Sequence, residues 1–448
     1  MNIFMTQKST LLSVLLCTIT CLSINASTPL GMFAPYDINI KLRKPGDNNW
    51  QFNLLGEKSY KVQGYATNSS AYVFPGSTTT ANEDTTYNVN VLQIYEPIQN
   101  IVSMYQGFDN AGAMVQTITT PFTQLLDSIA GGPGGGVSNI GTGLYAPTGT
   151  LSCGQISFGM TYAFGKGFYF STYLPVCFAQ LSNVCWNYAG NNTLFSDQKI
   201  QTEMIDLFAQ DSQAYFDLNI GNWKQQGLGD LAFIAEWQRD FPQRRLVLRN
   251  VQANVRIGIT IPTAKPANEH VIMPVPFGAD GAVGIPFGGG LGLSLGNIAE
   301  LGFSGQFWYF CSNEKLRRVK TFPTQTSLLF PIVTQTFKEF AIMQNFNLYA
   351  QLYTYSKRLS AKAVYQHWRR QKEKLMTFSS EFNFDVVNSA QSIDELTRHQ
   401  ISIFGIYSPI RGDFKRIIPQ FEVFWKGAFG GTRAAIASTV GAQFSLIF

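Results

Sequence analysis

The sequence predicts an all-β protein, a transmembrane antiparallel β-barrel of about twelve strands with short helices in external loops or in a plug. Three observations predict it: few charges beside many aromatic residues, apolar residues at a period of two, and connections that alternate between long and short. Charged residues make up 14 % of the 448 residues and aromatic residues also 14 %, against ~25 % charged residues in a typical soluble domain. A chain so rich in Phe and Tyr buries ample apolar surface, which excludes disorder.

The N-terminus has the features of a secretory signal peptide, which we predict over residues 1–26. Lys8 precedes an apolar stretch at 11–17, and Ala26 supplies a small residue for cleavage. Beyond this segment no stretch approaches the ~18–20 apolar residues that a membrane-spanning helix needs. The sequence therefore predicts export, with residues 27–448 forming the barrel.

The last strand shows the period of two most clearly. Apolar residues share one parity near the C-terminus, namely Val440, Ala442, Phe444, Leu446 and Phe448. The opposite parity is mostly polar or small, as is typical of a strand with different environments on its two faces. Similar alternation over 251–261 runs for roughly the ~9–11 residues that a tilted strand needs to cross a bilayer. Such strands must close into a barrel, because the hydrocarbon leaves no partner for an open edge; a soluble sandwich is the alternative.

Connections of two lengths separate the predicted strands. The strands are 49–66, 150–164, 168–186, 228–239, 246–263, 282–296, 299–312, 345–358, 360–376, 397–408, 415–427 and 432–448. Long and short connections alternate from 67–149 to 409–413, as expected when periplasmic turns are short and external loops long. The alternative is a barrel of fourteen strands that adds 37–42 and a strand near 328–336.

Aromatic residues fall near both ends of these strands, where girdles are expected at the membrane interfaces. The external set is Trp186, Trp308, Tyr309, Trp368 and Trp425. The periplasmic set is Phe164, Phe168, Trp237, Tyr407 and Phe448.

The long insert at 67–149 is the least barrel-like part of the chain, and it is predicted to be a plug or a lid. Apolar residues recur at helical spacing over 98–105, and a second helix is expected to start at Pro121. A further helical stripe lies at 200–208, and residues 392–395 read as a capping box. The Gly-rich run at 131–136 lacks the Gly-Lys-Ser/Thr of a phosphate loop.

Two segments resemble known families. The alternating residues Val440, Phe444 and Leu446, with a terminal Phe448, resemble the C-terminal assembly signal of bacterial outer-membrane barrels, which implies recognition by the barrel-assembly machinery. Residues 227–263, with Gly-Leu-Gly-Asp-Leu opening a strand and Ile-Pro-Thr ending the next, are similar to channels of the phenol meta-degradation pathway and, more remotely, to long-chain fatty-acid transporters. The Asn-Pro-Ala tripeptide of the latter is absent. The resemblance implies a transport-type barrel.

The sequence shows no arrangement for catalysis or metal binding, so no enzyme and no cofactor are expected. The three histidines, His270, His367 and His399, have no metal-ligand spacing. Twelve-stranded outer-membrane phospholipases use a His-Ser pair, but the sequence near His367 does not resemble them. Cys153 and Cys177 are predicted to be diagonal neighbours and free thiols. A formal charge of +5, scattered along the chain, does not indicate nucleic acid.

Polar residues on the inward parity are predicted to line a pore. They are Glu236, Asn250, Gln252, Asn254, Arg256, Asn347, Tyr349 and Gln351. Glu236 and Arg256 lie on adjacent strands, where they form either a structural ion pair or a selectivity element. Twelve basic residues lie between Lys315 and Lys374. Those at 315–320 and 369–374 flank predicted external strand ends, where Arg and Lys either bind lipopolysaccharide phosphates or are simply solvated loop charges.

The function predicted from these features is passive uptake of small solutes, hydrophobic or aromatic ones among them, through the bacterial outer membrane. A non-conducting surface barrel for adhesion or envelope structure is the alternative, and a membrane-embedded lipid hydrolase is the least favoured one.

Overall fold

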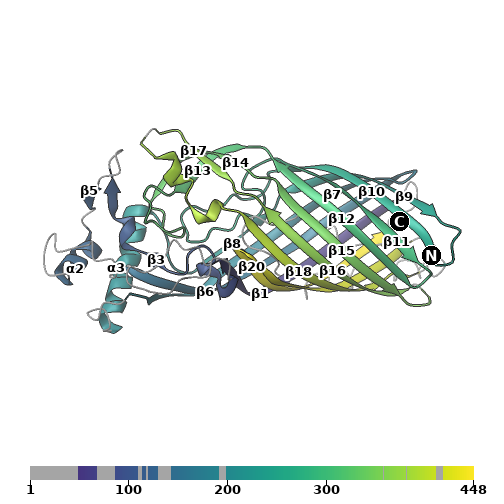
Figure 1. Cartoon of the computed structure of the whole chain (residues 1–448), viewed down its shortest axis with the longest axis horizontal. Helices are drawn as coiled ribbons and strands as arrows, with labels where there is room; N and C mark the ends of the chain where they lie inside the picture. The colour runs from purple at the N-terminus through teal and green to yellow at the C-terminus, as the bar shows by residue number, and fades with distance from the viewer. Residues whose placement is uncertain are drawn as a thin grey trace, which may run out of the picture.

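The computed structural model describes residues 49–67, 86–108, 114–117, 120–129, 143–190, 198–356, 358–379, 381–409 and 417–448. Within these residues twelve antiparallel strands close into a barrel (Figure 1). The strands in order are β1 (Trp50–Thr67), β6 (Leu144–Gly165), β7 (Phe168–Tyr188), β9 (Leu231–Pro242), β10 (Leu248–Ile261), β11 (Gly284–Leu295), β12 (Ala299–Phe310), β15 (Met343–Tyr353), β16 (Leu359–Arg370), β18 (Leu396–Tyr407), β19 (Ile418–Thr432) and β20 (Ala434–Ile447). β1 pairs with both β20 and β6, which closes the ring.

Each of the twelve predicted strands overlaps one barrel strand, so the prediction of twelve is confirmed. The fourteen-strand alternative is wrong. Residues 332–339 form β14 (Ile332–Glu339), which pairs with β13 (Asn313–Val319) and β17 (Lys374–Thr377) in a separate sheet. The other segment of that alternative, 37–42, and the predicted signal peptide lie outside the described residues.

The remaining elements lie in the long connections. They are β2 (Thr86–Asn90), η2 (Val91–Gln93), β3 (Gln99–Asn100), η3 (Val102–Met104), β4 (Gln106–Phe108), β5 (Met114–Thr117), α2 (Pro121–Ile129), α3 (Gln198–Phe216), β8 (Trp223–Leu228), α4 (Phe384–Val387) and η5 (Gln391–Ile393). Most of them gather at the end of the barrel away from the C-terminus, as Figure 1 shows for α2, α3 and the β13–β14–β17 sheet. None of the helices in the described part of the chain is long and apolar enough to cross a membrane.

The two faces of the barrel wall differ as the alternation predicts. On β10 the side chains of Val255, Ile257 and Ile259 are exposed, whereas that of Arg256 between them is buried. On β20 the side chain of Val440 is exposed, whereas Thr439 and Ser445 on the other parity are buried. An apolar outer face of this length is the surface that meets hydrocarbon. The chain is an outer-membrane β-barrel, with short turns at one end and long connections at the other. Because such barrels have short periplasmic turns and long external loops, we call these the periplasmic and the external end.

Helix predictions in the connections have mixed outcomes. The helix predicted to start at Pro121 is α2, and the stripe at 200–208 lies in α3, with Met204 and Phe208 buried. The helix expected over 98–105 is wrong, because Gln99 and Asn100 pair with β6 and leave only the short η3 turn beyond them. The capping box at 392–395 is also wrong, since Ser392 lies within η5 and Glu395 binds Arg369.

One strand position in the barrel wall is interrupted. β8 and β9 both pair with β7, on either side of Gly229 and Asp230, and β9 alone pairs with β10. The Asp230 carboxylate accepts hydrogen bonds from the backbone N–H groups of Ala264 (3.2 Å) and Ala279 (2.6 Å). The connection at 262–283 thus covers the part of the wall where strand pairing is interrupted, and the buried Asp230 carboxylate holds it there.

Aromatic rings fill the space above glycines on the inner wall. A methyl group in place of the Gly441 hydrogen would lie 2.6 Å from Cε2 of Phe424 and 2.7 Å from Cβ of Glu57. Gly302 is covered by the Tyr349 ring in the same way. Glycine within a strand commonly marks such a close approach.

We expect Gly441→Leu to destabilise the barrel by about 1–3 kcal/mol, because the added side chain overpacks the Phe424 ring. The matched control is Ala442→Leu, whose side chain lies on the lipid-facing parity. The measurement is the temperature at which each variant loses the compact electrophoretic mobility of a folded barrel. Equal transition temperatures for Gly441→Leu and Ala442→Leu would contradict the packing described.

Candidate functional site: the barrel interior and its external mouth

Polar side chains form rows across the inner wall from β12 to β18. Strand pairing places Ser304 opposite Asn347, Asn347 opposite Gln366, and Gln366 opposite Gln400. The Gln400 amide donates to Oε1 of Gln366 at 2.8 Å, and the Ser402 hydroxyl donates to the same oxygen at 3.1 Å. All of these side chains are buried. The interior of the barrel is therefore polar and closely packed in this region.

The predicted pore residues on β15 belong to this wall. Asn347 donates to the Ser304 hydroxyl at 3.3 Å, and Gln351 donates to the Ser360 hydroxyl at 2.9 Å. The Tyr349 hydroxyl donates to Oε1 of Glu300 at 2.7 Å. The structure thus brings these three residues together on the inner face, each tied to a neighbouring strand.

The predicted pore residues on β9 and β10 lie on a neighbouring part of the wall, separated from β15 by β11 and β12. Glu236 and Arg256 are directly opposite each other in the strand register. Asn250 and Gln252 each donate to Oδ1 of Asp240 at 3.0 Å, and Asn254 lies further along the same face. Because β10 begins at Leu248, next to a short turn, these amides lie toward the periplasmic end of the interior. Their role as pore-lining residues stays a prediction.

An apolar cluster occupies the periplasmic half of the interior. Its members are Leu55, Tyr349, Val364, Phe404, Ile406 and Phe424, all buried. Lys362 lies 5.1 Å from the Tyr349 ring centre and 5.3 Å from that of Phe404, and Lys426 lies 4.5 Å from that of Phe424. Lys426 also forms an ion pair with Glu57 at 2.7 Å. These contacts make a cation-edged aromatic layer on one side of the inner wall, from β15 round to β1, which we call the aromatic constriction.

Residues 91–105, which we call the mouth segment, pack against the inner wall at the external end of the barrel. Its apolar side chains are almost fully buried, namely Val91, Leu92, Ile94, Ile101, Val102, Met104 and Tyr105. They share one apolar cluster with inward residues of the wall, namely Val62, Leu151, Ala435 and Ala437. Contact is close at Gly64, where an added methyl group would lie 3.0 Å from Cδ1 of Ile94 and nearer still to Cγ1.

A second external connection holds the mouth segment in place. The Glu96 carboxylate accepts hydrogen bonds from the Ser327 backbone N–H (3.1 Å) and hydroxyl (3.0 Å). The Asn100 N–H donates to the Thr326 hydroxyl, and the Gln325 amide donates to the Ser103 carbonyl, each at 3.4 Å. Burial raises the pKa of Glu96 above its usual range. The connection at 320–331 thus binds the mouth segment along its length.

Three tryptophans assigned to the external girdle do not belong to it. Trp186, Trp308 and Trp368 are buried, and the rings of Trp308 and Trp368 stack with centres 5.2 Å apart. For Trp308 the reason is strand parity, since it lies on the same side of β12 as the buried Gln306. Trp186 is instead covered by Phe208 of α3. Tyr309 and Trp425 are exposed, as the girdle requires. Arg398 lies 5.5 Å from the Trp368 ring centre, so the upper interior also combines an aromatic surface with a cation.

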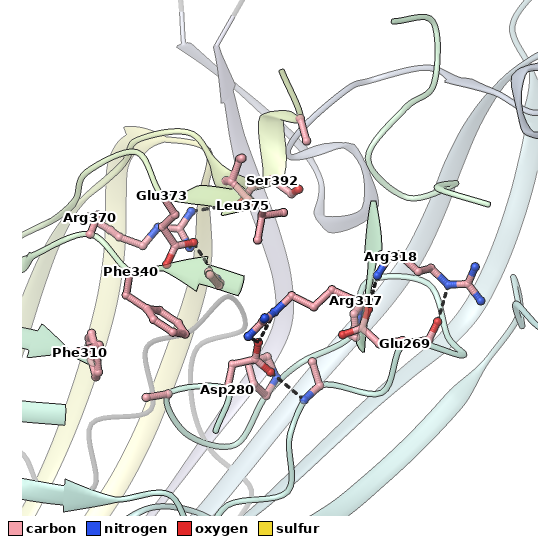
Figure 2. Close-up of a pocket in the computed structure, with 18 of the residues that line it drawn as sticks. Glu269, Asp280, Phe310, Arg317, Arg318, Phe340, Arg370, Glu373, Leu375 and Ser392 are labelled. Atoms are coloured by element: carbon pink, nitrogen blue, oxygen red, sulfur yellow. Dashed lines mark hydrogen bonds and ion pairs between the residues drawn. The ribbon is translucent and has the colours of Figure 1, made fainter. Parts of the chain in front are cut away.

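Many of the basic residues between Lys315 and Lys374 form ion pairs within the external connections. Asp280 binds Lys315 (2.5 Å) and Arg317 (3.2 Å), and Glu373 binds Lys338 (2.9 Å) and Arg370 (3.4 Å) (Figure 2). Burial opposes ionisation of both acids, but these cations hold the pKa of Asp280 and of Glu373 below its usual range. Arg369 and Lys372 are more exposed and pair with Glu395 and Asp394. Lipopolysaccharide binding stays a prediction.

The histidines and cysteines lie apart from the polar rows. His270 pairs with Asp217 at an exposed site, and His367 stacks near His399 with ring centres 4.9 Å apart. Cys153 and Cys177 are free and buried, as predicted. No group of three or more His, Cys, Asp or Glu side chains within the described ranges has the arrangement of a metal site.

Comparison with known proteins gives a likeness of architecture. No family model and no curated protein matches the sequence. Among solved structures, an outer-membrane channel from Pseudomonas putida F1 is similar over 91 % of this chain and 100 % of that one, with a TM-score of 0.44 and 9 % identity. The toluene transporter TbuX of Ralstonia pickettii is similar over 90 % of this chain and 89 % of that one, with a TM-score of 0.32 and 8 % identity.

The ion pairs of Asp280 make the external connections sensitive to acid. Because the folded-state pKa of Asp280 lies below its unfolded value, the pairs stabilise the connections above the unfolded pKa of about 3.9 and are lost as pH falls through the folded pKa. Asp280→Asn leaves two buried cations without this partner and should cost about 3–5 kcal/mol. The measurement is hydrogen exchange or limited proteolysis of residues 264–283 at pH 7 and at pH 3.

The control is Asp217→Asn, which removes an exposed partner of His270 and should change stability by less than about 1 kcal/mol. This role of Asp280 would be excluded if residues 264–283 were equally protected from exchange or proteolysis at both pH values. It would also be excluded if their protection were the same in Asp280→Asn and in wild type.

Proposed function

We propose that the protein is an outer-membrane channel for passive uptake of small solutes, hydrophobic or aromatic ones among them. The observation that carries the proposal is a closed barrel whose buried inner wall combines amides with aromatic rings, as in the rows that contain Gln366, Trp368 and Arg398. Amide side chains exchange hydrogen bonds with a polar group, and ring faces accept an apolar body. A barrel of this strand number has a narrow lumen, since eight strands are filled by side chains and sixteen to eighteen leave a wide aqueous channel.

Two barriers divide the route in this proposal, the mouth segment outside and the aromatic constriction inside. The mouth segment lies outside the barrel strands, so its displacement would widen the external end of the lumen without breaking strand pairing. The aromatic constriction consists of side chains of barrel strands, so it would widen through changes of side-chain rotamer alone. The dense contacts at Gly64 and at Glu96 support the part of the proposal in which the docked mouth segment restricts the external entrance.

The direct test is flux through the full-length protein in liposomes, measured for phenol and for a neutral sugar, together with single-channel conductance in planar bilayers. We expect phenol to enter faster than through protein-free liposomes, with the sugar strongly retarded by the aromatic constriction. Absence of both flux and conductance would overturn the proposal and favour a non-conducting surface protein.

The mouth segment gives a sharper test. Gly64→Leu puts a side chain where Ile94 packs, and such overpacking costs about 1–3 kcal/mol. A cost of this size raises the fraction of molecules in which the mouth segment has left the inner wall (the undocked arrangement) by about 5–150-fold. We expect a matching rise in open probability and in phenol flux. The matched control is Gly405→Leu, because a methyl group at Gly405 would meet a side-chain atom of Val423 at an ordinary 3.5 Å. Equal conductance of both variants and wild type would show that the mouth segment is not a barrier.

A further inference from the structure

A cavity of about 210 Å³ lies among the external connections, beside the β13–β14–β17 sheet. It is lined by five cationic side chains and three carboxylates, and its apolar walls include Phe310, Phe330 and Phe340 (Figure 2). The volume is below the ~300–1,000 Å³ typical of pockets for drug-sized ligands. Met343, which packs against Trp308 and Trp368 at the top of the barrel interior, also lines the cavity.

The carboxylates of the cavity are already neutralised. Asp280 and Glu373 each bind two cations, as described above, and Glu269 pairs with Lys315 at 3.3 Å. Arg318, by contrast, uses its guanidinium on backbone carbonyls, among them those of Phe330 (3.0 Å) and Phe216 (2.8 Å). Its charge is therefore not matched by a directly bonded carboxylate, and the lining keeps a positive balance.

Three donors in the lining are left available. The Lys320 side chain is 8 % exposed, and among the described residues its ammonium has no hydrogen bond or ion pair. The Arg370 Nε–H is buried and likewise has no partner within the described ranges. Tyr95 lines the same cavity, and burial raises the pKa of its phenol to about 12, so the hydroxyl keeps its proton and is able to donate it in a hydrogen bond.

Lys320 lines the cavity and its ammonium has no ionic partner among the described residues, so a bound anion would supply the missing charge. Burial lowers the pKa of Lys320 below its usual range, as expected for a cation removed from water, while the more distant Glu96 and Asp394 act against that shift. The phenylalanine walls favour an apolar body next to the anionic group, because rings bury it without leaving polar groups unpaired.

We propose that this cavity binds a small organic anion, a carboxylate on an aromatic ring, through Lys320, Tyr95 and Arg370. The carboxylate accepts hydrogen bonds from these three donors, and the ring packs against Phe310 and Phe340. The inference rests on the proposed function only in taking this anion to be a solute that the barrel admits; binding itself does not depend on transport.

The test is calorimetric titration of the detergent-solubilised full-length protein with benzoate, and with benzyl alcohol as a neutral ligand that has the same ring. We expect saturable binding of benzoate and much weaker binding of benzyl alcohol. Lys320→Gln should weaken benzoate binding by about tenfold or more, because it removes a charged donor. Tyr95→Phe should weaken it by a smaller factor. Lys372→Gln, the control, removes an exposed lysine that is paired with Asp394 outside the cavity lining.

Heat-stable electrophoretic mobility establishes that each variant is folded. If Lys320→Gln does not fold, Lys320→Arg, which keeps the charge, replaces it. Lys320→Arg should retain benzoate binding, whereas Tyr95→Phe should lose part of that binding. Equal binding of benzoate and benzyl alcohol, no saturable binding of benzoate, or binding unchanged in both Lys320→Gln and Tyr95→Phe would overturn the inference. If inorganic phosphate competes for the site as strongly as unlabelled benzoate does, the inference that the site selects an aromatic ring is wrong. Failure of binding with intact phenol flux refutes the inference alone, whereas binding without any flux or conductance refutes the proposed function.

Discussion

The structure depends on one constraint: no backbone N–H or C=O group of a lipid-exposed strand can be left unpaired in hydrocarbon. β1 meets this constraint for the whole molecule, because it pairs with β20 at the end of the chain and with β6. Once the ring is closed, every strand has an outer face in lipid and an inner face that is enclosed. The constraint therefore places polar residues on the inner face, whatever their individual contacts. The interruption between β8 and β9 is tolerated because Asp230 accepts hydrogen bonds from the backbone of the adjoining connection.

Enclosure in turn determines the chemistry of the interior. A polar side chain buried without a partner costs free energy, so the inner face is organised as hydrogen-bonded rows such as Gln366, Gln400 and Ser402. Charges on this face lie against rings or opposite charges, as Lys426 does with Phe424 and Glu57. The same packing that stabilises the wall narrows the lumen, so stability and a restricted route for solutes have one physical origin.

The period of two made the barrel predictable from the sequence, because each slip of one residue would turn a whole apolar face away from lipid. The parity of Asn347, Tyr349 and Gln351 also followed from it. What could not be predicted is where the connections lie. Distance from the strand end places Trp308 in the outer girdle, whereas its parity, shared with the buried Gln306, turns it inward. The hydrogen-bond partner of Glu96, Ser327, lies 231 residues further along the chain, and no local sequence pattern reports such a contact.

The connection at 320–331 joins the two external features of the molecule. It begins at Lys320, in the wall of the cavity, and continues to Gln325, Thr326 and Ser327, which bind the mouth segment. A ligand in the cavity would shift the docking of the mouth segment only to the extent that it binds the docked and undocked arrangements unequally. Lys320 and Glu96 interact electrostatically in the docked arrangement, so an anion that compensates the Lys320 charge would weaken that attraction. Charge compensation at one end of this short connection is thus a physical means by which an external anion could loosen the closure at its other end.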